Sequence, residues 1–171
     1  MPPELQAALD QLRQELFNHD HDGGYFRPVY TNKLVGEFPS RVNILSATIA
    51  TTGNTDIYVI APTSGNLVSV DFSATDALAA SDSAYITFTI TNLGQGGAGS
   101  TAMLAATDAN TTKATGGTAI TANDKWASGL TLSATPNNTQ VVEGDRLLIR
   151  AAATGTLANT ITFPTYMLRF V

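Results

Sequence analysis

The stretch YITFTITN (Tyr85–Asn92) alternates between apolar side chains and threonine through most of its length. Successive side chains of a β-strand point to opposite faces of a sheet, so this pattern predicts a strand with one face on a core and the other in water. Residues 67–75 repeat the pattern, with Val68, Val70 and Phe72 expected on the core face. These two segments indicate a protein built from half-buried antiparallel strands.

Further short runs of β-branched and aromatic residues lie on both sides of these two segments, separated by Gly, Asn and Pro. The expected strands are 42–50, 57–61, 67–75, 85–92, 102–105, 119–121, 130–134, 140–142, 146–153 and 161–170. The expected turns are 52–54, 63–66, 94–99, 116–117, 136–138 and 143–145, with longer loops at 81–83 and 108–113. Many short strands without intervening helices predict a mainly β protein, with a jelly-roll-like antiparallel β-sandwich over residues 41–171.

The charge, the hydropathy and the absence of cysteine exclude several kinds of partner and site. Charged residues make up 13% of the 171, against roughly 25% in an average soluble domain, and the net charge is −5. Phosphate binding needs clustered Lys and Arg, so no nucleic-acid partner is expected. Without an apolar run long enough to span a bilayer, no membrane partner is expected either. The chain has no cysteine, which excludes disulfides, zinc–thiolate sites and a thiol nucleophile.

Residues 1–18 are expected to form a short helix that starts at Pro2-Pro3. Within it Leu5, Leu9, Leu12 and Leu16 recur at spacings of four, three and four residues, which is the pattern of a coiled-coil seam. The leucines are therefore candidate trimerisation residues, although the same pattern also fits an amphipathic helix lying on its own domain. Two heptads are too short to associate alone, so the β domain is expected to oligomerise as well.

Residues 19–40 are expected to form a junction and extended linker, which carries both histidines of the chain, His19 and His21. Side chains at i and i+2 of an extended chain point to one side, so three copies on a three-fold axis would offer six imidazoles to an octahedral transition-metal ion. Two other interpretations stay open. The histidines can be exposed residues without a specific role, or the run Asn18-x-Asp20-x-Asp22-Gly23 can bind calcium, although Val29 stands where an EF-hand loop needs a carboxylate.

No catalytic residue is predicted. A catalytic triad needs a rigidly placed histidine, and both histidines precede the expected sandwich. The carboxylates Asp71, Asp76, Asp82, Asp108, Asp124 and Glu143 are expected to be solvated loop residues rather than a catalytic pair. The glycine-rich run 94–99 lacks the Lys-Ser/Thr ending of a phosphate-binding loop. Trp126 is expected to pack in the interior, with a sugar-stacking platform as the alternative.

The order of a Leu-rich helix, a His-Asp-His-Asp-Gly junction at 19–23 and a β region that ends in Tyr166–Val171 resembles the small trimeric virion proteins of tailed bacteriophages. These include capsid decoration (cement) proteins, head fibres and tail-fibre tips. The segment Arg146–Arg150 after Gly144-Asp145 also resembles trimeric jelly rolls of the tumour-necrosis-factor type, but the N-terminus has no secretion signal.

The resemblance to phage proteins implies a homotrimer made in the host cytoplasm and placed on the capsid exterior. There it would bind the major capsid protein, partly through residues 25–39, and stabilise the head. In phage fibre and spike proteins, His-x-His motifs on a three-fold axis bind a metal ion, and His19 and His21 are the residues that match. The alternative function is a tail or head appendage that binds a host receptor or glycan.

Overall fold

The computed structural model describes residues 40–126 and 129–171. These residues form eight strands and two short 3₁₀ helices. The strands are β1 (Ser40–Leu45), β2 (Gly53–Ile60), β3 (Gly65–Ser73), β4 (Tyr85–Asn92), β5 (Thr101–Ala102), β6 (Gln140–Val141), β7 (Arg146–Thr154) and β8 (Thr165–Phe170). The 3₁₀ helices are η1 (Asp108–Asn110) and η2 (Pro136–Thr139).

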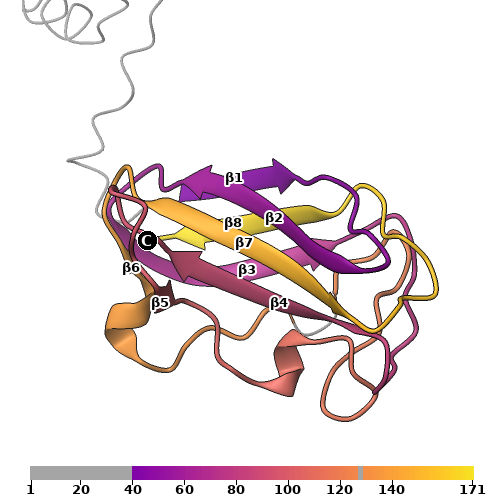
Figure 1. The fold of residues 1–171 in the computed structure, drawn as a ribbon. Coiled ribbons are helices and arrows are strands. Elements are labelled where there is room, and N and C mark those ends of the chain that lie inside the picture. The colour runs from indigo at the N-terminus through magenta and orange to yellow at the C-terminus, as the bar shows by residue number, and fades with distance from the viewer. Residues whose placement is uncertain (1–39, 127–128) are drawn as a thin grey trace, which may run out of the picture. The chain divides into compact units, whose positions relative to one another are not determined.

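The strands form two antiparallel sheets that lie face to face (Figure 1). The first has the order β1-β8-β3-β6 and the second the order β2-β7-β4-β5. The predicted mainly β class and the antiparallel two-sheet architecture are therefore confirmed. Both sheets end in a very short strand, β6 in the first and β5 in the second, so loops cover much of the β3 and β4 edges.

The core lies between the sheets and is centred on four aromatic side chains. Phe72 of β3, Phe88 of β4 and Tyr166 of β8 are fully buried, and their ring centroids lie 4.8 to 6.3 Å apart. Trp126 packs on Phe88 at 5.2 Å and donates from Nε1 to the carbonyl of Thr118 at 3.1 Å. Burial of such a ring contributes about 1.5–3 kcal/mol. Trp126 is thus the interior packing residue that the sequence predicted.

Strand β4 has the predicted bounds and the predicted faces. Ile86, Phe88 and Ile90 are buried, whereas the threonines between them are partly or fully exposed. In β3 the expectation for Val68 is wrong. A β-bulge between Leu67 and Ser69 shifts the register with β8, so Leu67 enters the core and Val68 is exposed.

Several predicted strands are shorter than expected or absent. Residues 119–121 and 130–134 form only isolated bridges, namely Leu78 with Ile120, Val70 with Leu130 and Leu104 with Leu132. Residues 46–50 and 161–164 likewise leave the sheet, apart from a bridge between Ile49 and Ile161. Conversely, β2 begins at Gly53, inside a predicted turn. Pro164 explains the late start of β8, because proline has no N–H to donate to a neighbouring strand.

Candidate functional site

The sequence-predicted site residues all lie outside the described residues. These are the metal candidates His19 and His21 and the seam residues Leu5, Leu9, Leu12 and Leu16. The N-terminal helix 1–18 and most of the junction 19–40 lie outside them too. Within residues 40–126 and 129–171, no three His, Cys, Asp or Glu side chains are grouped as metal ligands. No helix in this part of the chain is long and apolar enough to cross a membrane.

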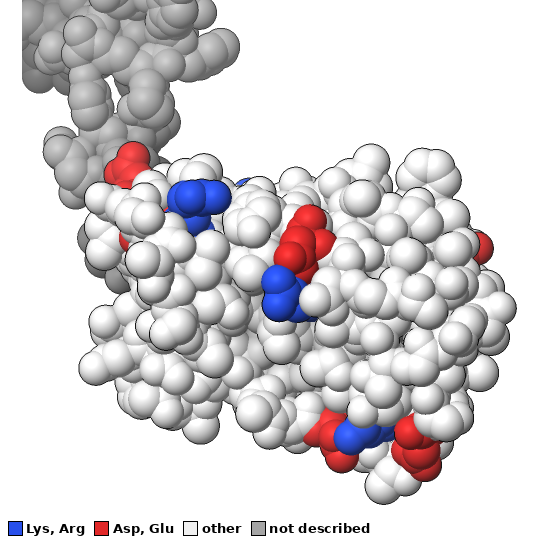
Figure 2. Space-filling model, viewed as in Figure 1, with Lys and Arg blue, Asp and Glu red and all other residues white. Residues whose placement is uncertain are grey.

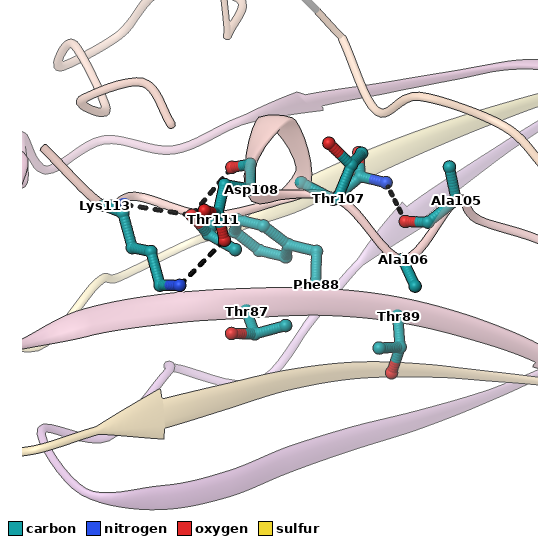
Figure 3. Close-up of a pocket in the computed structure, with 10 residues that line it drawn as sticks. Thr87, Phe88, Thr89, Ala105, Ala106, Thr107, Asp108, Thr111 and Lys113 are labelled. Atoms are coloured by element: carbon teal, nitrogen blue, oxygen red, sulfur yellow. Dashed lines mark hydrogen bonds and ion pairs between the residues drawn. The ribbon is translucent and has the colours of Figure 1, made fainter. Parts of the chain in front are cut away.

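A first pocket, the edge pocket, lies beside β4 where the following loop departs from the strand edge (Figure 3). Backbone hydrogen bonds join the loop to β4 at both ends of the loop. The Met103 N–H donates to the Ile90 carbonyl at 2.8 Å, and the Thr112 N–H donates to the Ile86 carbonyl at 2.9 Å. Between these points it bulges outward and carries η1. The pocket that remains has a volume of about 430 Å³.

The polar groups of the edge pocket bind one another. Lys113 Nζ lies 2.7 Å from Asp108 Oδ1, and this hydrogen bond raises the pKa of Lys113. Asn110 is buried and donates to the carbonyls of Ala105 and Thr131 at 2.8 and 2.9 Å, while its Oδ1 accepts from the Thr131 N–H. Because these groups hold the loop, the pocket offers no unpaired acid or base for proton transfer.

A second site, the outer groove, runs along the outer face of the β1-β8-β3-β6 sheet. It consists of two adjoining pockets of about 400 and 410 Å³ that share Ser73, Lys125 and Thr165. Met167 lines one pocket and Phe163 lines the other. Lys125 Nζ lies 2.6 Å from Asp71 Oδ1. The outer groove therefore combines apolar side chains with hydroxyls and one ion pair.

The carboxylates that were expected to be solvated mostly serve as loop anchors. Asp82 accepts from the Thr115 N–H at 2.8 Å and the Thr115 hydroxyl at 2.9 Å, and these bonds lower its pKa. Asp76 accepts from the hydroxyl and the N–H of Thr162, which lowers its pKa as well. Asp82 and Asp76 therefore each hold a loop segment in place.

Sequence reasoning missed the buried polar residues that join loops to strands. The sequence pattern predicts only a turn at Asp145, yet this residue is 7% exposed and its carboxylate accepts two hydrogen bonds. The side chain of Thr112 accepts from the Ile86 N–H at 2.8 Å inside the protein. An Asp after Gly144 at the end of a turn is a weak indication of such a bond, because Asp side chains commonly accept from nearby backbone N–H groups.

No protein-family model, curated protein or solved structure matches this chain.

The outer face of the second sheet carries few charged side chains (Figure 2). Its central feature is the ion pair between Asp56 of β2 and Arg150 of β7. Beside it Tyr58 and Ile60 are 55% and 56% exposed, and Arg146 lies over the Tyr58 ring at 5.4 Å from the centroid. Tyr58 and Ile60 therefore form a small exposed apolar pair beside the ion pair.

Proposed function

We propose that the sandwich is a jelly roll. In a jelly roll the chain forms one long hairpin with its turn between β4 and β5. Such a hairpin pairs β1 with β8, β2 with β7, β3 with β6 and β4 with β5, and all four antiparallel pairs occur. Rolling up that long hairpin brings β3 beside β8 and β4 beside β7, which also occur. Eight strands in two sheets of this order support the jelly-roll assignment, and jelly rolls are common in viral capsid and lectin domains.

On this fold we propose a structural function, that of a trimeric decoration or cement protein on the exterior of a phage capsid. The observation that carries the proposal is the pairing pattern of the eight strands, because it matches an architecture widely used in viral shells. The weakly charged face with Tyr58 and Ile60 supports association with neighbouring subunits. In this proposal the segment Leu5–Leu16 gathers three chains, and His19 and His21 bind a transition-metal ion on the axis.

The test is a particle that lacks this protein. Such particles are expected to assemble but to lose their genome at lower temperature or lower salt than complete particles, and added protein is expected to restore them. Genome release can be followed with a dye that fluoresces on binding DNA. If the deficient particles were as robust as complete ones but failed to adsorb to cells, the decoration function would be wrong.

The second candidate function is an appendage that binds a host receptor or glycan. One observation favours it, namely the exposed aromatic ring of Phe163 beside hydroxyl and amide groups in the outer groove. A purified protein that binds to host cells and blocks infection would favour this function over decoration.

A further inference from the structure

We propose that the outer groove binds a neutral pyranose sugar, with the ring of Phe163 as the stacking surface. This inference names a ligand class for the second candidate function and does not depend on the decoration function. The two adjoining pockets of about 400 and 410 Å³ fall within the roughly 300–1,000 Å³ of small-ligand sites. They are lined by strand residues and by the loop residues 123–125, which an isolated bridge between Ser73 and Lys125 joins to β3.

The first support is the conformation of Phe163. The backbone of Phe163 has a φ of +48°, and the residue is 64% exposed. A bulky residue in the left-handed region is rare and costs free energy, and it persists only where the surroundings fix it. Phe163 thus presents an apolar ring to water in a backbone conformation that local preference opposes.

Hydrogen bonds on both sides of Phe163 hold this conformation. The Thr162 N–H donates to Asp76 Oδ2 at 2.6 Å, and the Thr162 carbonyl accepts from the Thr75 hydroxyl at 2.9 Å. On the other side, the Pro164 carbonyl accepts from the Ser46 N–H at 2.8 Å. The backbone that carries the ring is therefore fixed before any ligand arrives, which reduces the entropy lost on binding.

The second support is the polar lining next to the ring. Ser73 and Asn123 line the same pocket, and neither side chain forms a hydrogen bond with another described residue. A hydroxyl and an amide can each donate and accept, as sugar hydroxyls require. A pyranose has apolar C–H patches on its faces and hydroxyls around its rim, so it can pack one face on Phe163 while its rim contacts these two groups.

The charges of the outer groove favour a neutral sugar over an acidic one. Lys125 is the ammonium group of the groove, and Asp71 already binds it at 2.6 Å. Asp124 lines the same pocket as Phe163 and adds a second carboxylate. A sugar acid would meet two carboxylates against one paired ammonium, and like charges at close range disfavour binding.

The experiment is saturation-transfer NMR on the full chain with the methyl glycosides of glucose, galactose, mannose and N-acetylglucosamine, and with glucuronic acid as the acidic probe. At least one neutral glycoside is expected to receive saturation, and the acidic probe is expected to receive none. Absence of transfer to all four neutral glycosides would overturn the inference. The trimer and particle tests would be unaffected by that result, so the two failures are distinguishable.

Variants locate the binding. Phe163→Gly removes the aromatic ring, and Asn123→Gly removes the side-chain amide. Glycine suits both positions, because Asn123, with a φ of 58°, has a left-handed backbone as Phe163 does. Both variants should keep their melting transition while the affinity weakens, about tenfold or more for Phe163→Gly. Phe163→Tyr should retain binding, as should Tyr58→Ala, a control at another exposed aromatic residue, which lies on β2. Unchanged binding in Phe163→Gly would contradict the assignment.

Discussion

Asp145 accepts a hydrogen bond from Asn92 across the end of the sandwich, from Nδ2 to Oδ2 at 2.9 Å. The same carboxylate oxygen accepts from the Val142 N–H at 2.8 Å, and Asn92 Oδ1 accepts from the Gly94 N–H at 2.7 Å. One buried carboxylate therefore ties the end of β4 to the turn before β7, although the two residues are far apart in sequence.

Replacing Asp145 with Ala is expected to lower the free energy of unfolding by about 2–3 kcal/mol, because it removes the two hydrogen bonds that this carboxylate accepts from Asn92 and Val142. The measurement is urea denaturation followed by tryptophan fluorescence, which reports on the buried Trp126. Asp124→Ala is the control, since Asp124 is exposed and its side chain accepts, among the residues that the structure describes, a hydrogen bond from the Lys125 N–H alone. Equal effects of the two substitutions would mean that the Asp145 bonds contribute little.

The cross-strand pair of Asp56 and Arg150 predicts a pH-dependent contribution to stability. Arg150 donates from Nε and Nη2 to the two carboxylate oxygens, both at 2.7 Å, and this hydrogen bonding lowers the pKa of Asp56. Because the folded pKa is lowered, the stabilisation is present above the pKa of an unfolded aspartate, about 3.9, and is lost as pH falls through the folded pKa.

Asp56→Asn is therefore expected to lower the free energy of unfolding by about 1 kcal/mol near neutral pH, the upper end of the range for an exposed ion pair. At an acidic pH below the pKa of Asp56 in the folded protein, wild type and variant should have equal stability. Thermal unfolding at neutral pH and at this acidic pH measures both effects. Arg150→Lys keeps the charge but loses the two parallel bonds, and so it should show part of the neutral-pH effect. A difference between wild type and Asp56→Asn that did not change with pH would rule out this explanation.

Tyr166 predicts a stabilising substitution. Its hydroxyl is buried and has no hydrogen-bond partner among residues 40–126 and 129–171, and burial raises the pKa of the phenol. Tyr166→Phe keeps the ring packed on Phe72 and removes the unpaired hydroxyl, so it should raise the free energy of unfolding by about 1 kcal/mol. Tyr58→Phe, at an exposed hydroxyl, should change it little. A less stable Tyr166→Phe protein would show that the hydroxyl has a partner.

The strands could be predicted where alternation and β-branched residues coincide. In β4 and β7 each core position is apolar over eight or nine residues, and the structure has these strands at or within one residue of the predicted bounds. Residues 119–121 and 130–134 have the same local preference but form single bridges. Local preference cannot tell a full strand from a bridge, because the difference depends on how much of a neighbouring edge is available.

The outer groove could not be predicted from the sequence. The sequence predicts a strand over 161–170 that includes Phe163, because its apolar side chain fits the β pattern. Its left-handed conformation is held by the hydrogen bonds that Thr162 forms with Asp76 and Thr75. These two residues lie more than 80 positions earlier in the sequence. Pro164 was the one local indication, since a proline interrupts a central strand. The bulge at Val68 likewise depends on the pairing of β3 with β8.

The metal proposal predicts that purified protein contains a transition-metal ion and that a chelator lowers its melting temperature, because a ligand bound only to the assembled state stabilises that state. The double substitution His19→Ala and His21→Ala should remove the metal and the effect of the chelator together. Elemental analysis by mass spectrometry measures the first and differential scanning fluorimetry the second. Protein without metal and indifferent to chelator would refute the metal site.

The proposed structural role requires that three chains assemble, and sedimentation equilibrium of the full chain measures this directly. The expected mass is three times that of the 17.9 kDa chain. The double substitution Leu9→Ser and Leu12→Ser should weaken the association, because it removes apolar contacts from the proposed seam. A protein that sediments as a monomer at every concentration tested would contradict the account.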